Sequence, residues 1–309
     1  MTEVDYSKWI LKLGSQEAKA LSYGLGAVLC WSTVATAFKV ALTVLDTVQL
    51  VFYANLTAVV LLLGIVAARG DMLKLPSVFV AHWRLTLMAG ALNPVIYYLI
   101  LFKAYELLPA QVAMTINYTW SIVLVFMAIV FLRQRILPAD GIAALVCYGG
   151  VFVIATGGDL YAFSQAGIVG LGLALLSTVI WAGYWTLNIA DKREPVTGLT
   201  LNFMVALPVS AGVCAITSDF SVTLNGLLAA AYVGIVEMTV AFVLWSIALK
   251  LTRNAARVSN LIFLAPFVSL VIINQVLGEA ILPATLVGLL FIIGGLIYQQ
   301  RAHVRVSKT

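Results

Sequence analysis

Ten apolar runs follow one another along this chain, with only short polar stretches between them. Each run is close to the ~20 residues that a helix needs to cross about 30 Å of hydrocarbon. A spanning segment must satisfy its backbone hydrogen bonds internally, so we predict an all-α integral membrane protein with ten transmembrane helices. The runs cover residues 20–38, 49–68, 84–103, 109–132, 138–156, 167–189, 198–217, 224–247, 254–277 and 281–299.

The composition excludes a soluble globular protein. Hydrophobic residues make up 62% of the 309 residues and charged residues only 10%, whereas soluble domains carry about 25% charged residues. The net charge of +5 does not indicate nucleic-acid binding, because the basic residues lie between the apolar runs and form no single patch. The three cysteines lie singly within apolar runs, so we expect neither a disulfide framework nor a metal site.

The second half of the chain repeats the first at a spacing of 145 residues. Ile136-Leu137-Pro138-Ala139 returns as Ile281-Leu282-Pro283-Ala284, and Gly149-Gly150 returns as Gly294-Gly295. We predict that these four glycines mark close helix contacts, because small residues let helix backbones approach in lipid; simple tolerance of glycine in membrane helices is the alternative. Each copy contains five apolar runs, which is an odd number. The second copy must therefore cross the membrane upside down relative to the first, an arrangement found in many secondary transporters.

These repeats divide the chain into four parts, and the basic residues predict its orientation. We expect an N-terminal segment (1–18), two inverted five-helix repeats (19–156 and 157–300) and a basic tail (301–309). If the N-terminus is cytoplasmic, 16 of the 18 basic residues fall in cytoplasmic segments, and only Lys39 and Lys103 do not. Positive charge resists translocation, so both termini are predicted to be cytoplasmic.

The run 84–103 has a proline near its centre. Pro94 has no N–H and leaves the carbonyl of Gly90 without its helical partner, which at this depth is tolerated only against protein or a wet cavity. Asn93 and Tyr97 are four residues apart and share a helix face. We predict that both line a substrate path. A packing kink in which Asn93 bonds to a neighbouring helix is the alternative.

Aromatic residues lie deep in three other runs. Tyr and Trp usually occupy the membrane interfaces, and their polar atoms need partners when they are buried. A central cavity is one explanation, and a buried aromatic packing cluster is the other. We predict a cavity lined by Trp31, Asn117, Tyr118, Trp120, Trp181 and Trp185.

Glu237 is the one ionisable side chain deep within any run. A charged carboxyl at the bilayer centre costs about 2.5–3.5 kcal/mol on insertion scales, so it must be neutral, paired or beside a wet cavity. Gly90 and Gly234 align at a spacing of 144 residues, which sets Glu237 opposite Asn93. We predict that Glu237 faces the cavity and binds a substrate ammonium or exchanges a proton. A protonated carboxyl that donates one structural hydrogen bond is the alternative.

The run 254–277 supplies two further candidates. Asn260 and Phe263 share a helix face, and Pro266 frees the carbonyl of Ile262. By the symmetry of the repeats they face the same centre as Tyr118. Ordinary core packing is the alternative for Phe263.

The chain combines the five-plus-five spans with Leu108-Pro109-Ala110 at the start of the fourth run and with the paired Ile-Leu-Pro-Ala and Gly-Gly ends. On these features it resembles the drug/metabolite transporter superfamily, and more narrowly its ten-helix EamA-domain members. Trp31 and Trp181, in the middle of the first and sixth runs, also match the pattern of that family. The motifs Asn-Pro-x-x-Tyr-Tyr from Asn93 and Asn-Tyr-x-Trp from Asn117 resemble the YddG-type aromatic amino-acid exporters.

One feature departs from the family pattern. Many members have a Glu after the ninth span, and Glu279 occupies that place here. The equivalent place in the first repeat holds Gln134. The resemblance covers residues 20–300. It implies alternating access in a bacterial inner membrane, without enzymatic activity.

The residues favour a neutral or zwitterionic substrate with an aromatic or apolar side chain. No intramembrane Arg or Lys is available for a sugar phosphate. The usual metalloprotease, hydrolase and P-loop motifs are missing, so we expect no cofactor and transport that runs on a gradient. We predict a monomer whose partners are a small-molecule substrate, an aromatic or neutral amino acid, and the lipid bilayer.

Other functions stay open. The protein could export another metabolite or drug, such as a nucleobase, nucleoside or amine. A channel would need rings of charge or carbonyls, which the inverted repeats argue against. A non-transporting membrane protein would show no flux at all.

Overall fold

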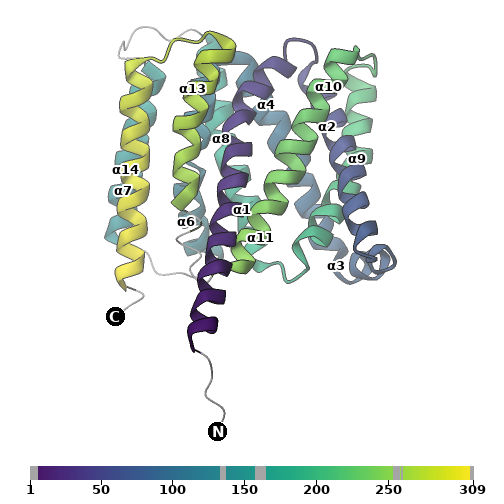
Figure 1. The fold of residues 1–309 in the computed structure, drawn as a ribbon. Coiled ribbons are helices and arrows are strands. Elements are labelled where there is room, and N and C mark those ends of the chain that lie inside the picture. The colour runs from purple at the N-terminus through teal and green to yellow at the C-terminus, as the bar shows by residue number, and fades with distance from the viewer. Residues whose placement is uncertain (1–5, 133–136, 157–164, 253–257, 259, 307–309) are drawn as a thin grey trace.

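The computed structural model is a helical bundle (Figure 1). It describes residues 6–132, 137–156, 165–252, 258 and 260–306, and no strand occurs among them. Seven helical stretches in this part of the chain are long and apolar enough to cross a membrane, and two shorter apolar helices, Pro138–Ile154 and Leu261–Leu277, accompany them. The remaining span covers residues 110–132 and is broken into two short helices. Counted with it, the described residues contain the ten predicted spans.

The first five spans are α1 (Tyr6–Ala41), α2 (Thr47–Ala68), α3–η2–α4 (Leu75–Gly90, Ala91–Ile96, Tyr97–Leu107), α5–α6 (Ala110–Asn117, Trp120–Leu132) and α7 (Pro138–Thr156); a short turn η1 (Met72–Lys74) precedes α3. The second five are α8 (Gln165–Ala190), α9 (Pro195–Thr217), α10–η3–α11 (Leu224–Tyr232, Val233–Ala241, Phe242–Leu251), η4–α13 (Asn260–Leu264, Ala265–Leu277) and α14 (Pro283–Val306). Proline opens α7, α9 and α14, where its missing N–H would have no helical partner in any case.

Helix α1 begins and helix α14 ends at the same end of the bundle (Figure 1). We call this end the terminal face and the opposite end the distal face. The first turns of α1 project beyond the bundle at the terminal face. The α8–α9 connection also lies at the terminal face, whereas the α1–α2 connection lies at the distal face.

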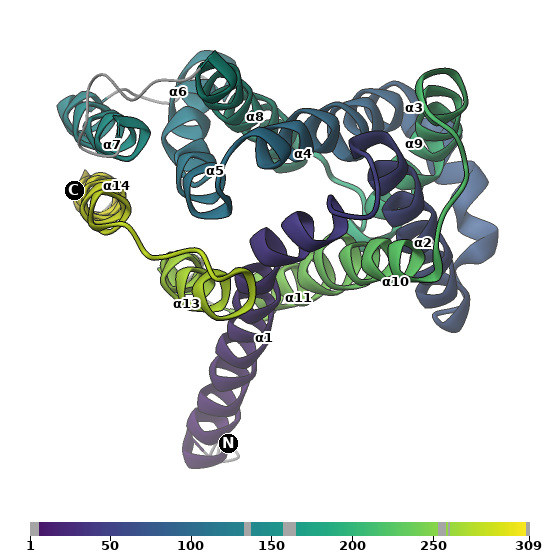
Figure 2. The same ribbon diagram turned by 90° about the horizontal axis from the view of Figure 1, so that it is seen from above.

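Helix contacts follow the two repeats. Helix α1 packs mainly against α11 and α13, and its repeat mate α8 packs mainly against α4 and α6, which are the mates of α11 and α13. Helix α2 packs against its own mate α9, and α7 packs against its own mate α14. Figure 2 shows the α7–α14 pair at one side of the bundle and α2, α3, α9 and α10 at the other. This reciprocal pattern matches the predicted inverted repeats.

The third and eighth spans are each interrupted by a π-helical segment at the corresponding place. Segment η2 contains Asn93, whose backbone is extended (φ −140°, ψ 119°), followed by Pro94. Segment η3 contains Glu237, and there the Thr239 hydroxyl donates a hydrogen bond to the Gly234 carbonyl, five residues back. The predicted break at Pro94 is confirmed, and π-segments of this kind often occur at functional sites.

The α7–α14 interface confirms two of the four glycines that we predicted at close helix contacts. A Cβ on Gly150 would lie 2.5 Å from the Gly288 carbonyl oxygen, and a Cβ on Gly295 would lie 2.6 Å from the Cys147 sulfur. Gly149 and Gly294 have nothing within 4 Å of such a Cβ, so the prediction is wrong for them. The reason is helical: adjacent residues point about 100° apart, so one glycine of each pair faces the partner helix.

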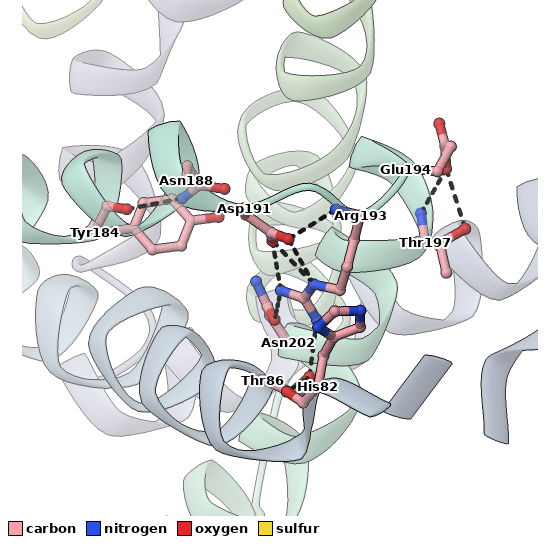
Figure 3. A network of polar contacts seen from close by, with 9 residues as sticks. All are labelled: His82, Thr86, Tyr184, Asn188, Asp191, Arg193, Glu194, Thr197 and Asn202. Carbon is pink, nitrogen blue, oxygen red and sulfur yellow. Dashed lines mark hydrogen bonds and ion pairs between the residues drawn. The ribbon is translucent and has the colours of Figure 1, made fainter. Parts of the chain in front are cut away.

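A buried ion pair joins three elements at the terminal face (Figure 3). Arg193 follows α8, and its side chain is almost completely buried against Asp191, with Nη2 2.7 Å from Oδ2. The guanidinium also donates to the Thr86 hydroxyl of α3 (2.8 Å) and to Asn202 Oδ1 of α9 (3.1 Å). A buried charge needs such partners because desolvation is expensive. The ion pair therefore fixes the α8–α9 connection against α3 and α9.

Candidate functional site

A cavity of about 570 Å³ lies inside the bundle, between the two repeats. It is lined by side chains from α1, α4, α5 and α6 of the first repeat and from α8, η3, α11, η4 and α14 of the second. We call it the central cavity. Its volume lies within the range of about 300–1,000 Å³ that is usual for small-molecule sites.

The central cavity brings together nine of the eleven residues that the sequence predicted. They are Trp31, Tyr97, Asn117, Tyr118, Trp120, Trp181, Trp185, Glu237 and Phe263.

The other two predicted residues differ. Asn93 is completely buried and is not among the lining residues, which corrects its predicted position. Its backbone is extended, so the helical spacing that would place Asn93 and Tyr97 on one face does not apply. The side chain of Asn260 lies outside the part of the chain whose side chains the structure describes.

Trp181 is the centre of the aromatic wall. Its ring stacks on Tyr97 with centroids 4.4 Å apart. Two further indoles meet it edge-on, Trp185 at 5.9 Å and Trp120 at 6.4 Å. Offset-stacked and edge-to-face pairs are the favoured geometries for aromatic rings. The α8 ring therefore holds the rings of α4 and α6 in fixed orientations along one side of the cavity.

Opposite repeats contribute a second aromatic group. Trp31 of α1 lies edge-on to Trp245, at 5.2 Å, and to Phe242, at 6.1 Å. Phe242 in turn stacks on Trp185 with an interplanar angle of 5°. The two groups are thus continuous, and a flat substrate ring would meet aromatic faces on more than one side.

Asn117 supplies a polar group inside this wall. Its amide nitrogen donates to the Ser177 hydroxyl of α8 (2.9 Å), and its amide oxygen accepts from the Tyr97 hydroxyl (3.4 Å). These bonds lie at the break between α5 and α6, which ends one helix at Asn117 and starts the next at Trp120. They hold Asn117 and Tyr97 in fixed positions across two spans.

Glu237 places a carboxyl at the cavity wall. Its side chain is only 5% exposed. The Tyr98 hydroxyl donates to Oε1 at 3.0 Å, whereas Oε2 has no hydrogen-bond partner among the described residues. The described lining contains no Lys, Arg or His. The unpaired oxygen needs a donor, because an unsatisfied buried acceptor is costly, and a ligand ammonium would supply one.

Sequence reasoning missed several lining residues. Phe38 and Tyr105 looked like ordinary core residues, and Trp245 lies eight residues after Glu237. The turns of the π-segment η3 contain more residues than α-helical turns. Glu237 and Trp245 therefore lie closer to the same helix face than α-helical spacing predicts. Gln299 also lines the cavity, and its position next to Gln300 near the end of an apolar run was a usable signal.

Comparisons with known proteins agree with this architecture. The family model described as "EamA-like transporter family" matches residues 18–156 and 168–298. The chain is 27% identical to Protein PecM of Dickeya dadantii (strain 3937) over 226 residues, which are 71% of this chain and 73% of that protein. It is 26% identical to an uncharacterized transporter of Archaeoglobus fulgidus over 270 residues, 84% of this chain and 91% of that protein.

A solved structure has the same fold. It is a protein crystal structure that is 22% identical in sequence and superimposes with a TM-score of 0.66. The match covers 91% of this chain and 98% of the other.

Proposed function

The chain belongs to the EamA-like transporter family, and from this premise we propose that it is a secondary transporter that exports aromatic and other neutral amino acids. Family membership establishes a membrane transporter of the drug/metabolite type. The choice of substrate and the direction of transport form the proposal.

The aromatic lining of the central cavity is the observation that carries the substrate assignment. Ten aromatic side chains line a cavity of about 570 Å³, and they include Trp31, Tyr97, Tyr118, Trp120, Trp181 and Trp185. Aromatic pairs contribute roughly 0.5–1.5 kcal/mol beyond the burial of area. A substrate that carries its own ring, such as phenylalanine or tryptophan, would therefore gain from several walls at once.

Glu237 supports a substrate with a positive group. The free Oε2 can accept a hydrogen bond from an ammonium, and the carboxyl lies among rings that favour a cation near their faces. The described lining offers no cation to a phosphate. A sugar phosphate would therefore enter this cavity with its charge unpaired, at a large desolvation cost.

Cationic amines are a second candidate class, and one observation favours them. The lining supplies a carboxyl for an ammonium but no described Lys or Arg for a substrate carboxylate. An amino acid must direct its carboxylate to neutral donors such as the amides of Gln299 and Gln300, which also line the cavity. An aromatic amine lacks that requirement.

The proposed direction follows from orientation and charge. The spans expected from the sequence put 16 of the 18 basic residues in segments on the side of both termini, and on this ground we assign the terminal face to the cytoplasm. The central cavity extends toward that face, since Leu249 and Gln300, which lie toward the terminal-face ends of α11 and α14, line it. A cytoplasmic solute would reach the cavity from that side.

Transport into liposomes tests the proposal. Purified protein is reconstituted, and uptake of radiolabelled phenylalanine, tryptophan, leucine and phenylethylamine is measured with and without a pH step. We expect saturable uptake of the two aromatic amino acids above protein-free liposomes. Uptake of phenylethylamine alone would replace the amino-acid assignment by the amine assignment, and uptake of none of them would overturn both.

A further inference from the structure

A second cavity lies at the distal face, and we call the side chains between it and the central cavity the wall. It has a volume of about 270 Å³, and Lys39, Glu106 and Glu279 are among the residues that line it. We call it the distal cavity. Adjacent residues of the chain face opposite sides of the wall: Phe38 and Tyr105 line the central cavity, and Lys39 and Glu106 line the distal one.

The wall itself is made of aromatic rings. Phe38 is 2% exposed and Tyr105 is 3% exposed, and their rings meet edge-on with centroids 5.3 Å apart. Phe102 closes the same cluster, 4.7 Å from Phe38. These buried, packed rings therefore fill the α1–α4 contact between the residues that line the two cavities.

A set of hydrogen bonds closes the other side of the wall. The carboxylate of Glu279 accepts from the backbone N–H groups of Ala110 (3.0 Å) and Gln111 (3.4 Å), which open α5. A carboxylate is favoured at this end of a helix because the first N–H groups have no helical partners. Glu279 belongs to the second repeat and α5 to the first, so these bonds join the two repeats.

Gln111 strengthens the same junction. Its side-chain amide donates to the Ala280 carbonyl (2.9 Å) and accepts from the Leu282 N–H (3.3 Å). Asn274 holds the other side of the connection by donating to the Glu279 carbonyl (3.0 Å). The start of α5 is thus held against the whole α13–α14 connection at the distal face.

We infer that Phe38, Tyr105 and the Glu279–Gln111 junction form the distal gate of the transporter, closed in this structure. The inference rests on the proposed function, because a gate has meaning only in a protein that exposes its cavity to each side in turn. Opening the gate requires α5 to leave the α13–α14 connection and the Phe38 and Tyr105 rings to part. The central and distal cavities then become one exit path past Lys39 and Glu106.

The Glu279 carboxylate is the part of this gate that a single substitution can weaken. Glu279→Ala leaves the N–H groups at the start of α5 without an acceptor, which favours a state in which water reaches them. Glu279→Gln keeps one acceptor oxygen and should have a smaller effect. Glu106→Ala is the matched control, because Glu106 also lines the distal cavity but its partners among the described residues, Lys103 and Thr47, both belong to the first repeat.

Accessibility from outside the cell measures the gate directly. Met114 lines the central cavity from α5, so Met114→Cys is introduced into a chain whose Cys30, Cys147 and Cys214 are replaced by alanine. A small membrane-impermeant methanethiosulfonate reagent is added to intact cells. We expect slow labelling in the parent and in Glu106→Ala, and labelling about tenfold faster in Glu279→Ala, because hydrogen bonds to a charged group are among the stronger ones.

Two results would overturn the gate. One is labelling of Glu279→Ala, and of Gln111→Ala as a second variant, at the parental rate while both variants elute as monodisperse protein. The other is rapid labelling of the parent, which would mean that the distal side of the cavity is already open. The assay needs no substrate, so it remains readable whether or not aromatic amino acids are transported.

Discussion

Glu237 is the residue whose chemistry most affects the proposed cycle. Its carboxyl lies at the cavity wall inside a π-segment, with one oxygen bonded to Tyr98 and the other without a partner among the described residues. A buried group with one unmet acceptor is stabilised when a ligand supplies the donor. We therefore expect the carboxylate to engage the substrate ammonium directly.

Substitution of Glu237 separates a functional role from a structural one. Glu237→Gln keeps the shape and can still accept the Tyr98 hydrogen bond, but it cannot carry charge. We expect transport to fall by about tenfold or more, as hydrogen bonds to charged groups predict, with little change in melting temperature. Tyr98→Phe, which removes the bond but keeps the carboxyl, should transport nearly normally. Parental transport with unchanged pH dependence in Glu237→Gln would show that the carboxyl is structural.

The rings of Tyr118 and Trp120 are expected to contact the substrate. Both line the central cavity, and each ring contributes roughly 0.5–1.5 kcal/mol beyond burial. Tyr118→Ala and Trp120→Ala should weaken the apparent affinity for phenylalanine and tryptophan by about three- to tenfold, the range that these energies imply. Trp83→Ala, at an exposed indole of α3 outside the cavity, is the control. Unchanged affinity in both cavity variants would refute the assignment.

At the scale of elements, the α7–α14 pair shows how this bundle is joined. Lipid tails are as apolar as the helices, so close packing of small residues must hold spans together. Gly150 and Gly295 each admit the partner helix where a Cβ would clash, and the Cys147 thiol donates to the Ile292 carbonyl across the same contact. The pair packs along most of its length.

Leucine at these glycines should destabilise the pair. Gly150→Leu and Gly295→Leu place a side chain into backbone and sulfur atoms of the partner helix, and overpacking of this kind costs about 1–3 kcal/mol. We expect a melting temperature lower by several degrees in detergent. Gly149→Leu and Gly294→Leu, whose Cβ positions are open, should melt like the parent. Equal loss in all four variants would mean that helix packing is not the cause.

Helix number and the break at Pro94 were predictable from the sequence, and the exact register was not. Run length and proline chemistry determine where spans occur and where they break, which gave ten spans and the break at Pro94. The position of Asn93 was not predictable, because its backbone is extended and helical spacing does not apply to it. Trp245 was missed because the π-segment η3 shifts the helical register after Glu237. Phe38 and Tyr105 could not be identified from the sequence for another reason. Their proposed role depends on their position between two cavities, which only the folded structure shows.

At the scale of the whole molecule, two inverted halves of five spans each place both termini at the same end of the bundle. Helix α1 begins and α14 ends at the terminal face (Figure 1), and the central cavity lies where the halves meet. Two similar halves in opposite orientation can exchange conformations, so one scaffold supplies both an inward-open and an outward-open state. With the terminal face assigned to the cytoplasm as proposed, the proposed distal gate corresponds to a state closed to the outside.

A fusion after Thr309 tests the orientation. The spans expected from the sequence put 16 of the 18 basic residues in segments on the side of the termini, so a fluorescent reporter that folds only in the cytoplasm should be bright there. An alkaline phosphatase fusion at the same place should be inactive. The opposite result would reverse the assignment of the terminal face and, with it, the proposed direction of transport.

The central claim is that this cavity carries aromatic amino acids by a carrier mechanism, and counterflow tests it most directly. Liposomes that contain the purified protein are loaded with excess unlabelled tryptophan and diluted into a trace of labelled tryptophan. The account predicts transient accumulation of label above its equilibrium level, reduced by about tenfold or more in Glu237→Gln and absent when the liposomes are loaded with a sugar phosphate. Label that only equilibrates, or enters no faster than in protein-free liposomes, would contradict it.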